Sequence, residues 1–457
     1  MRKRAFLLVL ALCLVCAAPA RAVTIRSTTT LTYPEGHNTL RYLAEHPDVS
    51  IEKTSWDYDT TLDLASRMTT RTFDTDIYFL DHGSINRETM MSKGFCLDMS
   101  GSEILMGMVS RMYPPIAEQI MFDGCLYAWP TDMTFTCMRI DPAAWEAAGL
   151  TLADIPDTFP AFLDFVECWC DRLEDDPELD IHIMGGMDGY DELFAERREA
   201  LYVDWLLELL IRQVVTQQQY AGEALRFDDV DAQNLIRRCD AVGRRIYRAE
   251  WANDMGNKGF FIAQDLWRWP DTTDGMVYLR LNEEQPKLIE AKLSTYAINP
   301  ATAYPELCIE LMEAYALSPS GEEPYDLYFF ADGEPSLHSW YETDRAECQA
   351  QAESLRLKLE DAALSGDDRM ALEDELAFWE DALARIEDRK WVLKPEALAD
   401  YRAHVDQLYF PTPSVLTELD AGGQIFKLRG QVSSGAISVD QFIQRPCEIT
   451  WMIQQEQ

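Results

Sequence analysis

The stretch LSTYAINPATAYPELCIELMEAY, residues 293–315, contains the signals of a strand, a turn and a helix in close succession. It begins with a short, mainly apolar run that ends at Ile298, and Asn299 and Pro300 are typical turn residues. Pro305 then indicates the first turn of a helix, because its fixed backbone angle suits that position. The apolar positions of this helix, which should face a core, are Cys308, Leu311, Met312 and Tyr315. None of these residues belongs to a catalytic motif, so we interpret the stretch as scaffold.

The N-terminal part of the chain alternates strand-like and helix-like segments. VTIRSTTTLTY (23–33), VSIEKTSW (49–56) and DIYFLD (76–81) are rich in β-branched and aromatic residues, whereas LRYLAEHPD (40–48) and TTLDLASRM (60–68) have helical spacing. This order predicts a parallel sheet with helices on its faces. Asp81 and His82 come directly after the third strand, which is where ligands of open α/β sheets bind.

The middle of the chain predicts a second lobe. MFDGCLYAWPTDMTFTCMRID (121–141) is expected to form two strands broken by Trp129 and Pro130, where the chain passes between lobes. Residues 157–253 are mostly helical in pattern, and GFFIA (259–263) and MVYLRL (276–281) predict strands of a second sheet. We therefore expect two α/β lobes joined by chain crossings.

The segment 344–389 has a different pattern. Its apolar residues step by three and four on both sides of the turn residues Ser365, Gly366 and Asp367. This predicts an antiparallel helical hairpin inserted in the globule. Its many charged residues are typical of a solvated face, and docking of a partner is an open alternative.

Composition and the N-terminus indicate an exported, acidic protein. The first 22 of the 457 residues combine Arg2, Lys3 and Arg4 with an apolar run and a small-residue ending, which predicts a signal peptide cleaved near Ala22. A lipid anchor on Cys13 or Cys16 is an alternative without a good lipobox. The formal charge of −39, made more negative by that cleavage, makes nucleic acid and anionic membranes poor partners.

The motif search gives no catalytic, metal or cofactor site. We find no phosphate-binding glycine loop, nucleophile elbow or zinc-protease helix, and the six histidines have no metal-ligand spacing. With 79 acidic residues, some pair always looks like a glycosidase dyad, so a secreted carbohydrate-active hydrolase is kept as an alternative. The nine cysteines from Cys96 to Cys447 do not resemble a small disulfide framework, and we expect mainly buried thiols.

Tryptophan residues next to aspartates suggest a sugar site. Trp129 precedes Asp132, and DLWRWPD places Trp267 and Trp269 between aspartates after a predicted strand. A pyranose presents apolar faces and hydroxyl groups, so indole rings and carboxylates suit it. Each tryptophan could instead fill a core.

Several segments, in a consistent order, resemble one known family. AINPATAYPELCIELMEAY (297–315), LAEHPDVSIE (43–52), TFDTDIYFLD (72–81), GCLYAWP (124–130), GLTLADIPDTFPAFLDF (149–165) and VDQFIQRPCEITWMIQQEQ (439–457) are similar to segments of the maltose-binding-like extracellular solute-binding proteins of ABC importers. Together they cover most of the mature chain. The 344–389 segment is longer than the usual pattern, and Pro446 and Cys447 interrupt the last helix.

The resemblance implies the two-lobed periplasmic-binding-protein type II fold with a hinge. Lobe 1 would comprise 23–139 and about 288–343, and lobe 2 would comprise 140–287 and about 394–457, with the hairpin insertion at 344–393. It implies capture of a polar solute, an oligosaccharide in our reading, and delivery to ABC permease subunits by a monomeric protein without enzymatic activity. A cationic ligand such as a polyamine or basic peptide is the alternative that the acidic composition leaves open.

From strand ends and aromatic residues we choose the residues expected to line the cleft between the lobes. They are Thr30, Tyr33, Asp81, His82, Trp129, Asp132, Trp267 and Trp269.

Overall fold

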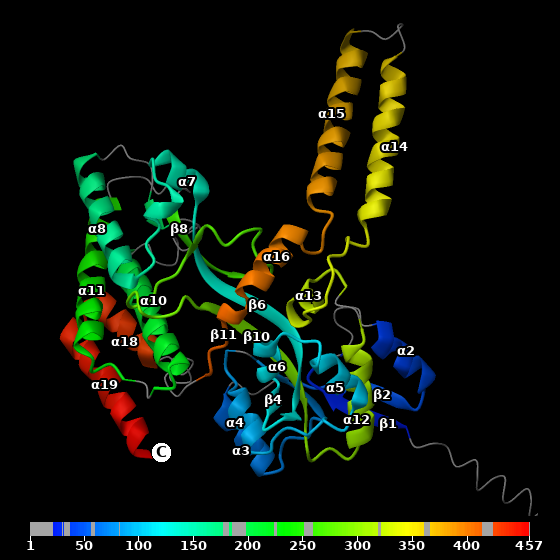
Figure 1. Ribbon diagram of the computed structural model, residues 1–457, viewed down its shortest axis with the longest axis horizontal. Helices are drawn as coiled ribbons and strands as arrows, with labels where there is room; N and C mark the ends of the chain where they lie inside the picture. The colour runs from blue at the N-terminus through cyan, green and yellow to red at the C-terminus, as the bar shows by residue number, and fades with distance from the viewer. Residues whose placement is uncertain are drawn as a thin grey trace, which may run out of the picture.

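The computed structural model in Figure 1 describes most of the chain. The described residues are 22–29, 31, 37–55, 60–81, 83–176, 182–184, 198–223, 226–250, 259–318, 321–360, 366–413 and 424–456. Residues 1–21 of the expected signal peptide lie outside these ranges, as do the expected site residues Thr30, Tyr33 and His82.

The N-terminal alternation forms the predicted parallel βαβαβ unit. Its elements are β1 (Val23–Ser27), α2 (His37–Glu45), β2 (Val49–Lys53), α3 (Thr61–Thr69) and β3 (Ile77–Leu80). β1 pairs in parallel with both β2 and β3. The prediction of a parallel sheet here is confirmed.

A single nine-stranded sheet runs through both lobes. Its order is β2-β1-β3-β10-β6-β8-β7, with β11 paired to β10 and β9 paired to β6. The additional strands are β6 (Ala128–Ile140), β7 (His182–Met184), β8 (Gly259–Leu266), β9 (Met276–Val277), β10 (Ile289–Ile298) and β11 (Leu408–Tyr409). The sequence predicted that β8 and β9 belong to a second sheet. They belong instead to this single sheet. β6 is long enough to pair with β10 in one lobe and with β8 in the other.

The predicted break at Trp129 and Pro130 is wrong, because β6 contains both residues. Residues 121–126 form a small hairpin of β4 (Met121–Phe122) and β5 (Cys125–Leu126), and β6 then continues through Pro130 without interruption. The register between β6 and β10 shifts at Ser294 and Thr295, so that Thr131 has no partner in β10. Because a proline cannot donate to the ladder, it is tolerated in a strand at such a bulge.

Two large hydrophobic cores define the lobes. The first contains Phe135 of β6 and buried residues of β1, β3 and β10, and it is covered by α5 (Glu103–Val109), α6 (Pro114–Glu118), α12 (Pro305–Ala316) and α13 (Tyr325–Phe329). A smaller core lies under α3 and α4 (Arg87–Ser92). The second large core starts at Met138, only three positions further along β6. Its helices are α7 (Pro142–Ala147), α8 (Phe159–Asp175), α10 (Arg198–Tyr220), α11 (Val230–Glu250), α18 (Gln424–Ser433) and α19 (Val439–Glu456).

The segment after residue 393 divides between the lobes, which differs from the expected assignment of 394–457 to lobe 2. In α16 (Pro395–His404), the side chains of Ala397, Leu398 and Tyr401 are buried in the first core. Among the described residues after α16, those of α18 and α19 pack on the second core. Tyr401 also donates a hydrogen bond to the Tyr328 carbonyl (2.8 Å), which fixes α16 against α13.

The two helices α14 (Tyr341–Leu359) and α15 (Gly366–Asp388) lie side by side and project from the body of the protein (Figure 1). Cys348, Ala352 and Leu355 of α14 are buried, whereas α15 has no buried residue among those described. Arg356 and Glu380 form an exposed ion pair between the two helices (2.7 Å). Packing within the pair therefore buries one side of α14 and leaves α15 largely in solvent.

Residues 293–315 form the end of β10 and most of α12. Cys308, Leu311, Met312 and Tyr315 are buried, as predicted. The Asn299 side chain donates to the Thr75 carbonyl (2.9 Å) and accepts from the Ala301 amide (3.0 Å). This side chain thus joins the turn to the segment before β3.

Two sequence expectations concern export and oxidation. The nine cysteines Cys96, Cys125, Cys137, Cys168, Cys170, Cys239, Cys308, Cys348 and Cys447 are free thiols, and most of them are at least partly buried. Over the described ranges, no helix is long and apolar enough to cross a bilayer.

Asn299→Ala should destabilise the chain by about 1–3 kcal/mol, because the buried Thr75 carbonyl loses a hydrogen-bond donor. Urea unfolding followed by circular dichroism measures this change. Ala303→Ser, at an exposed position of the same turn, is the control and should change the free energy of unfolding by less than about 0.5 kcal/mol. Equal effects of the two substitutions would contradict the role assigned to Asn299.

Candidate functional site

Polar residues occupy one face of β6 and β10 where these strands pass from the first core to the second. Directly paired residues in an antiparallel sheet point to the same side. The pairs Phe135 with Ala291 and Met133 with Leu293 lie in the first core. The opposite face carries three polar pairs, which we call the polar ladder: Asp132 with Ser294, Thr134 with Lys292 and Thr136 with Glu290.

The burial of the ladder varies along its length. Thr134 and Ser294 are buried, whereas Asp132, Thr136, Lys292 and Glu290 are partly exposed. A strand that ran through a dry core would be apolar on both faces. The alternation therefore indicates that this face of the crossing strands is in contact with solvent or a ligand.

The ends of β1 and β3 lie beside one end of the ladder. Tyr296, two residues beyond Ser294, donates a hydrogen bond from its hydroxyl to the Thr29 hydroxyl (3.0 Å). Burial raises the pKa of Tyr296 to about 12, and the nearby Asp132 charge acts in the same direction while the Thr29 bond opposes it. The phenol is therefore neutral at pH 7 and keeps its proton as a donor.

Asp81 and Arg87 lie behind the same end. Asp81 follows β3, and its carboxylate accepts from the Gly83 amide (3.0 Å) and the Ser84 hydroxyl (2.9 Å). The buried Arg87 guanidinium donates to the Leu293 carbonyl beside the bulge and to Gln119 (3.1 Å). Burial lowers the pKa of Arg87 to about 10, opposed by the Asp81 charge, so the guanidinium stays protonated at neutral pH.

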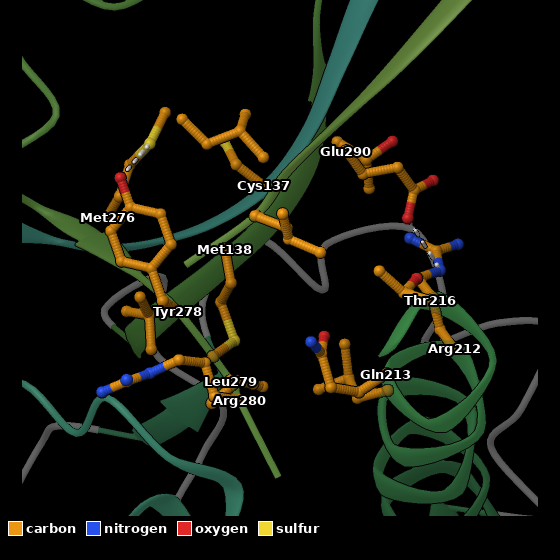
Figure 2. Close-up of a pocket in the computed structure, with 15 residues that line it drawn as sticks. Cys137, Met138, Arg212, Gln213, Thr216, Met276, Tyr278, Leu279, Arg280 and Glu290 are labelled. Carbon is orange, nitrogen blue, oxygen red and sulfur yellow. Dashed lines mark hydrogen bonds and ion pairs between the residues drawn. The ribbon is translucent and has the colours of Figure 1, made fainter. Parts of the chain in front are cut away.

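The other end of the ladder faces helix α10 of lobe 2. A cavity of about 100 Å³ lies between them (Figure 2). It is lined by residues 136–138 of β6, by Leu209, Arg212, Gln213 and Thr216 of α10, and by residues 276–280 and 288–290. Arg212 of α10 lies 3.9 Å from the Glu290 carboxylate, as the dashed line in Figure 2 marks. Sites for drug-sized ligands are typically about 300–1,000 Å³, so an oligosaccharide would need α10 to move away from β10.

Further contacts between α10 and lobe 1 are also polar. Gln219 accepts a hydrogen bond from the Tyr409 hydroxyl and donates to the Thr412 carbonyl (2.8 Å). Tyr409 belongs to β11, and both its burial and the Glu290 charge raise its pKa. Polar contacts of this kind can be exchanged for water at small cost, which suits two lobes that separate.

The structure brings two of the expected site residues to this region. Asp132 is part of the ladder, and Asp81 lies at the end of the neighbouring strand β3. Trp267 directly follows β8, whose last residue pairs with Phe135, and its side chain is exposed at the side of the crossing strands. Thr30, Tyr33 and His82 lie outside the described residues.

Trp129 and Trp269 lie elsewhere, inside the first core. Both are almost fully buried. The Trp269 indole donates to Asp400 (2.8 Å), and its ring packs edge-on against Phe135 and Tyr401. The burial of Trp269 could not be predicted from the aspartates next to it in the sequence. Its hydrogen-bond partner is Asp400, which is distant in the chain. In this conformation neither indole offers a face to a ligand.

Most residues of the ladder and of its lobe 2 wall were not predicted from the sequence. Thr134, Thr136, Glu290, Lys292 and Ser294 were not chosen, although the alternation in TDMTFT and IEAKLS was visible. Arg212 could not be identified as a site residue because it belongs to an amphipathic helix, where an arginine usually faces solvent. Over the described part of the chain, no group of three or more His, Cys, Asp or Glu side chains is arranged to hold a metal ion.

Replacing the buried Arg87 should lower the free energy of unfolding more than replacing an exposed arginine does. Arg87→Met should lower the free energy of unfolding by about 2–3 kcal/mol, because the Leu293 carbonyl and Gln119 lose a charged donor. Arg111→Met removes the exposed pair with Asp332 (2.7 Å) and should cost less than about 1 kcal/mol. Urea unfolding of both variants tests this, and an equally small cost at Arg87 would contradict the assignment.

Comparison with known proteins supports the fold. No family model matches the chain, and no curated protein sequence does. A periplasmic solute-binding protein of Pectobacterium atrosepticum matches with a TM-score of 0.52 and 13% identity, covering 95% of this chain and 99% of the other. An ABC substrate-binding protein of Listeria monocytogenes, solved in complex with cycloalternan, matches with a TM-score of 0.50 and 10% identity, covering 95% and 98%. The resemblance found in the sequence is therefore confirmed at the level of the fold.

Proposed function

We propose that this chain, which has the fold of an ABC transporter solute-binding protein, captures a polar solute between the polar ladder and helix α10. The observation that carries this proposal is the ladder itself, three polar pairs on the crossing strands that face another lobe. The partly exposed members of the ladder carry both hydrogen-bond donors and acceptors. A solute rich in hydroxyl groups has the matching donors and acceptors and could replace water on this face.

An oligosaccharide fits the chemistry of this surface best. The ladder offers the carboxylates of Asp132 and Glu290 as acceptors and the Lys292 ammonium as a donor. Tyr296, beyond Ser294 on β10, keeps a neutral hydroxyl group that donates to Thr29. Sugar hydroxyls both donate and accept, so they suit a surface that carries acceptors and donors together. The solute bound by the Listeria protein is also a saccharide.

The spacing of the carboxylates favours binding over hydrolysis. Asp132 and Glu290 are at opposite ends of the ladder, four residues apart along the strand direction, which is about 13 Å. The two carboxyl groups of a glycosidase lie about 5–9.5 Å apart. We therefore propose a binding protein that performs no chemistry, and turnover of any bound oligosaccharide would contradict this.

Closure of the lobes would follow from contacts made by the solute to both of them. Arg212 and Glu290 already connect α10 with β10 across the cavity. A ligand shifts such an equilibrium only when it contacts the closed form better. The closed, loaded form would then dock on an ABC permease after export directed by the N-terminal signal peptide.

A thermal-shift panel followed by calorimetry tests the proposed solute. We expect neutral oligosaccharides to raise the melting temperature more than amino acids, basic peptides or polyamines do. Asp132→Asn and Lys292→Met should each weaken binding about tenfold or more, since a hydrogen bond to a charged group contributes about 1.5–3 kcal/mol.

Asp48→Asn and Lys53→Met are matched controls at exposed positions around β2 and should leave the affinity unchanged.

Two carboxylates on the ladder give the cationic alternative a specific basis. A polyamine bound at the ladder with an affinity that falls steeply with salt would replace the oligosaccharide reading. Unchanged affinity in both ladder variants would contradict the proposed site.

A further inference from the structure

A second and larger cavity is lined by residues at the base of α14 and α15. Figure 1 shows these two helices projecting from the body of the protein. The volume of the cavity is about 660 Å³. Four parts of the chain line it, namely the loop at 268–271, Glu322, the residues His338 and Trp340 before α14, and residues 388–389 and 391–394 at the end of α15 and after it. We call it the hairpin-base cavity. Its size is in the range of about 300–1,000 Å³ that is typical of ligand sites.

The hairpin-base cavity is separate from the polar ladder. Its inner wall includes Trp269, whose ring packs on Phe135 with a centroid distance of 4.8 Å. Phe135 points to the face of β6 opposite Thr134 and Thr136. None of the residues lining the cavity between β6 and α10 also lines this one. The crossing strands thus lie between the two sites.

Two partly exposed indole rings form part of the wall. Trp340 is stacked on His338, with ring centroids 5.1 Å apart and planes at 17°, and His338 is held in turn by the Glu322 carboxylate. The Lys390 ammonium lies 6.0 Å from the Trp391 ring centroid. The stack on His338 holds the Trp340 indole in place before a ligand arrives, which lowers the entropic cost of binding.

The charged groups around the cavity largely neutralise one another. Lys394 lies 3.0 Å from the Asp271 carboxylate and 3.3 Å from that of Asp388. Arg268 donates to the backbone carbonyls of Val392 and Glu322, both at 3.1 Å. A site of matched charges has no strong preference for an ion. It does present fixed donors and acceptors to a neutral ligand that has many hydroxyl groups.

We propose that the hairpin-base cavity is a second carbohydrate site, which binds a short run of neutral sugar residues against Trp340 and Trp391. The pair of indoles meets the apolar faces of pyranose rings, and the Lys394 and Arg268 clusters meet their hydroxyl groups. The site would hold a longer saccharide outside the cleft between the lobes. It is independent of the ladder, so either site can exist without the other.

Calorimetric titration of the full chain with maltohexaose, cellohexaose and xylohexaose tests the second site. The double variant Asp132→Asn/Lys292→Met removes the ladder contacts and should still bind one of these hexasaccharides. Adding Trp340→Ala and Trp391→Ala to it should then weaken that binding about tenfold or more, as the loss of stacked aromatic rings predicts.

Two controls separate loss of the site from loss of the fold. Trp391→Phe keeps an aromatic ring and should retain the affinity within about threefold, and circular dichroism should be unchanged in every variant. Phe378→Ala removes an exposed ring from α15, ten residues or about 15 Å along the helix before Asp388, and should leave the affinity as it is.

Three outcomes distinguish the proposals. Absence of hexasaccharide binding in the ladder variant would overturn the second site, and so would unchanged affinity after both Trp340→Ala and Trp391→Ala. In a third outcome, the wild-type chain and the variant Asp132→Asn/Lys292→Met bind the hexasaccharide equally well, and the two alanine substitutions abolish this binding. That result would support the second site and overturn the function proposed for the ladder.

Discussion

The antiparallel pairing of β6 with β10 is the constraint on which the rest of the structure depends. Its register sends Phe135 and Met133 to the first core and Asp132, Thr134 and Thr136 to the other face. A shift by one residue would exchange these two sets, placing polar groups in the core and apolar groups against solvent. One register therefore builds the core of lobe 1 and the candidate site together.

The bulge at Ser294 and Thr295 allows the two strands to serve both purposes. It accommodates Pro130, which has no amide proton for the ladder, and it lies next to the Leu293 carbonyl that the buried Arg87 satisfies. A buried guanidinium is costly, as the lowered pKa of Arg87 reflects. The arrangement stabilises an irregular backbone beside the site, as bulges near functional sites commonly do.

Local sequence patterns predicted the elements better than their long-range relations. The βαβαβ unit and the buried face of α12 followed from hydrophobic periodicity, because these patterns act over a few residues. The single sheet, the continuity of β6 and the packing of α16 on lobe 1 depend on pairing and burial between distant segments. In the candidate site, Asp132 was chosen from the sequence, whereas Trp129 and Trp269 were placed there although both lie in the first core. Their indoles could not be distinguished by sequence from exposed ones, since Asp400 and Tyr401 come from distant positions.

The central claim is that a polar solute binds on the polar ladder between the two lobes. The most direct measurement is a crystal structure of the chain with the compound that gives the largest thermal shift. Our account predicts that this solute forms hydrogen bonds with Asp132 and Lys292 and also contacts α10, with the cavity beside Arg212 enlarged or rearranged around it. A solute bound without contact to any ladder residue would contradict the account.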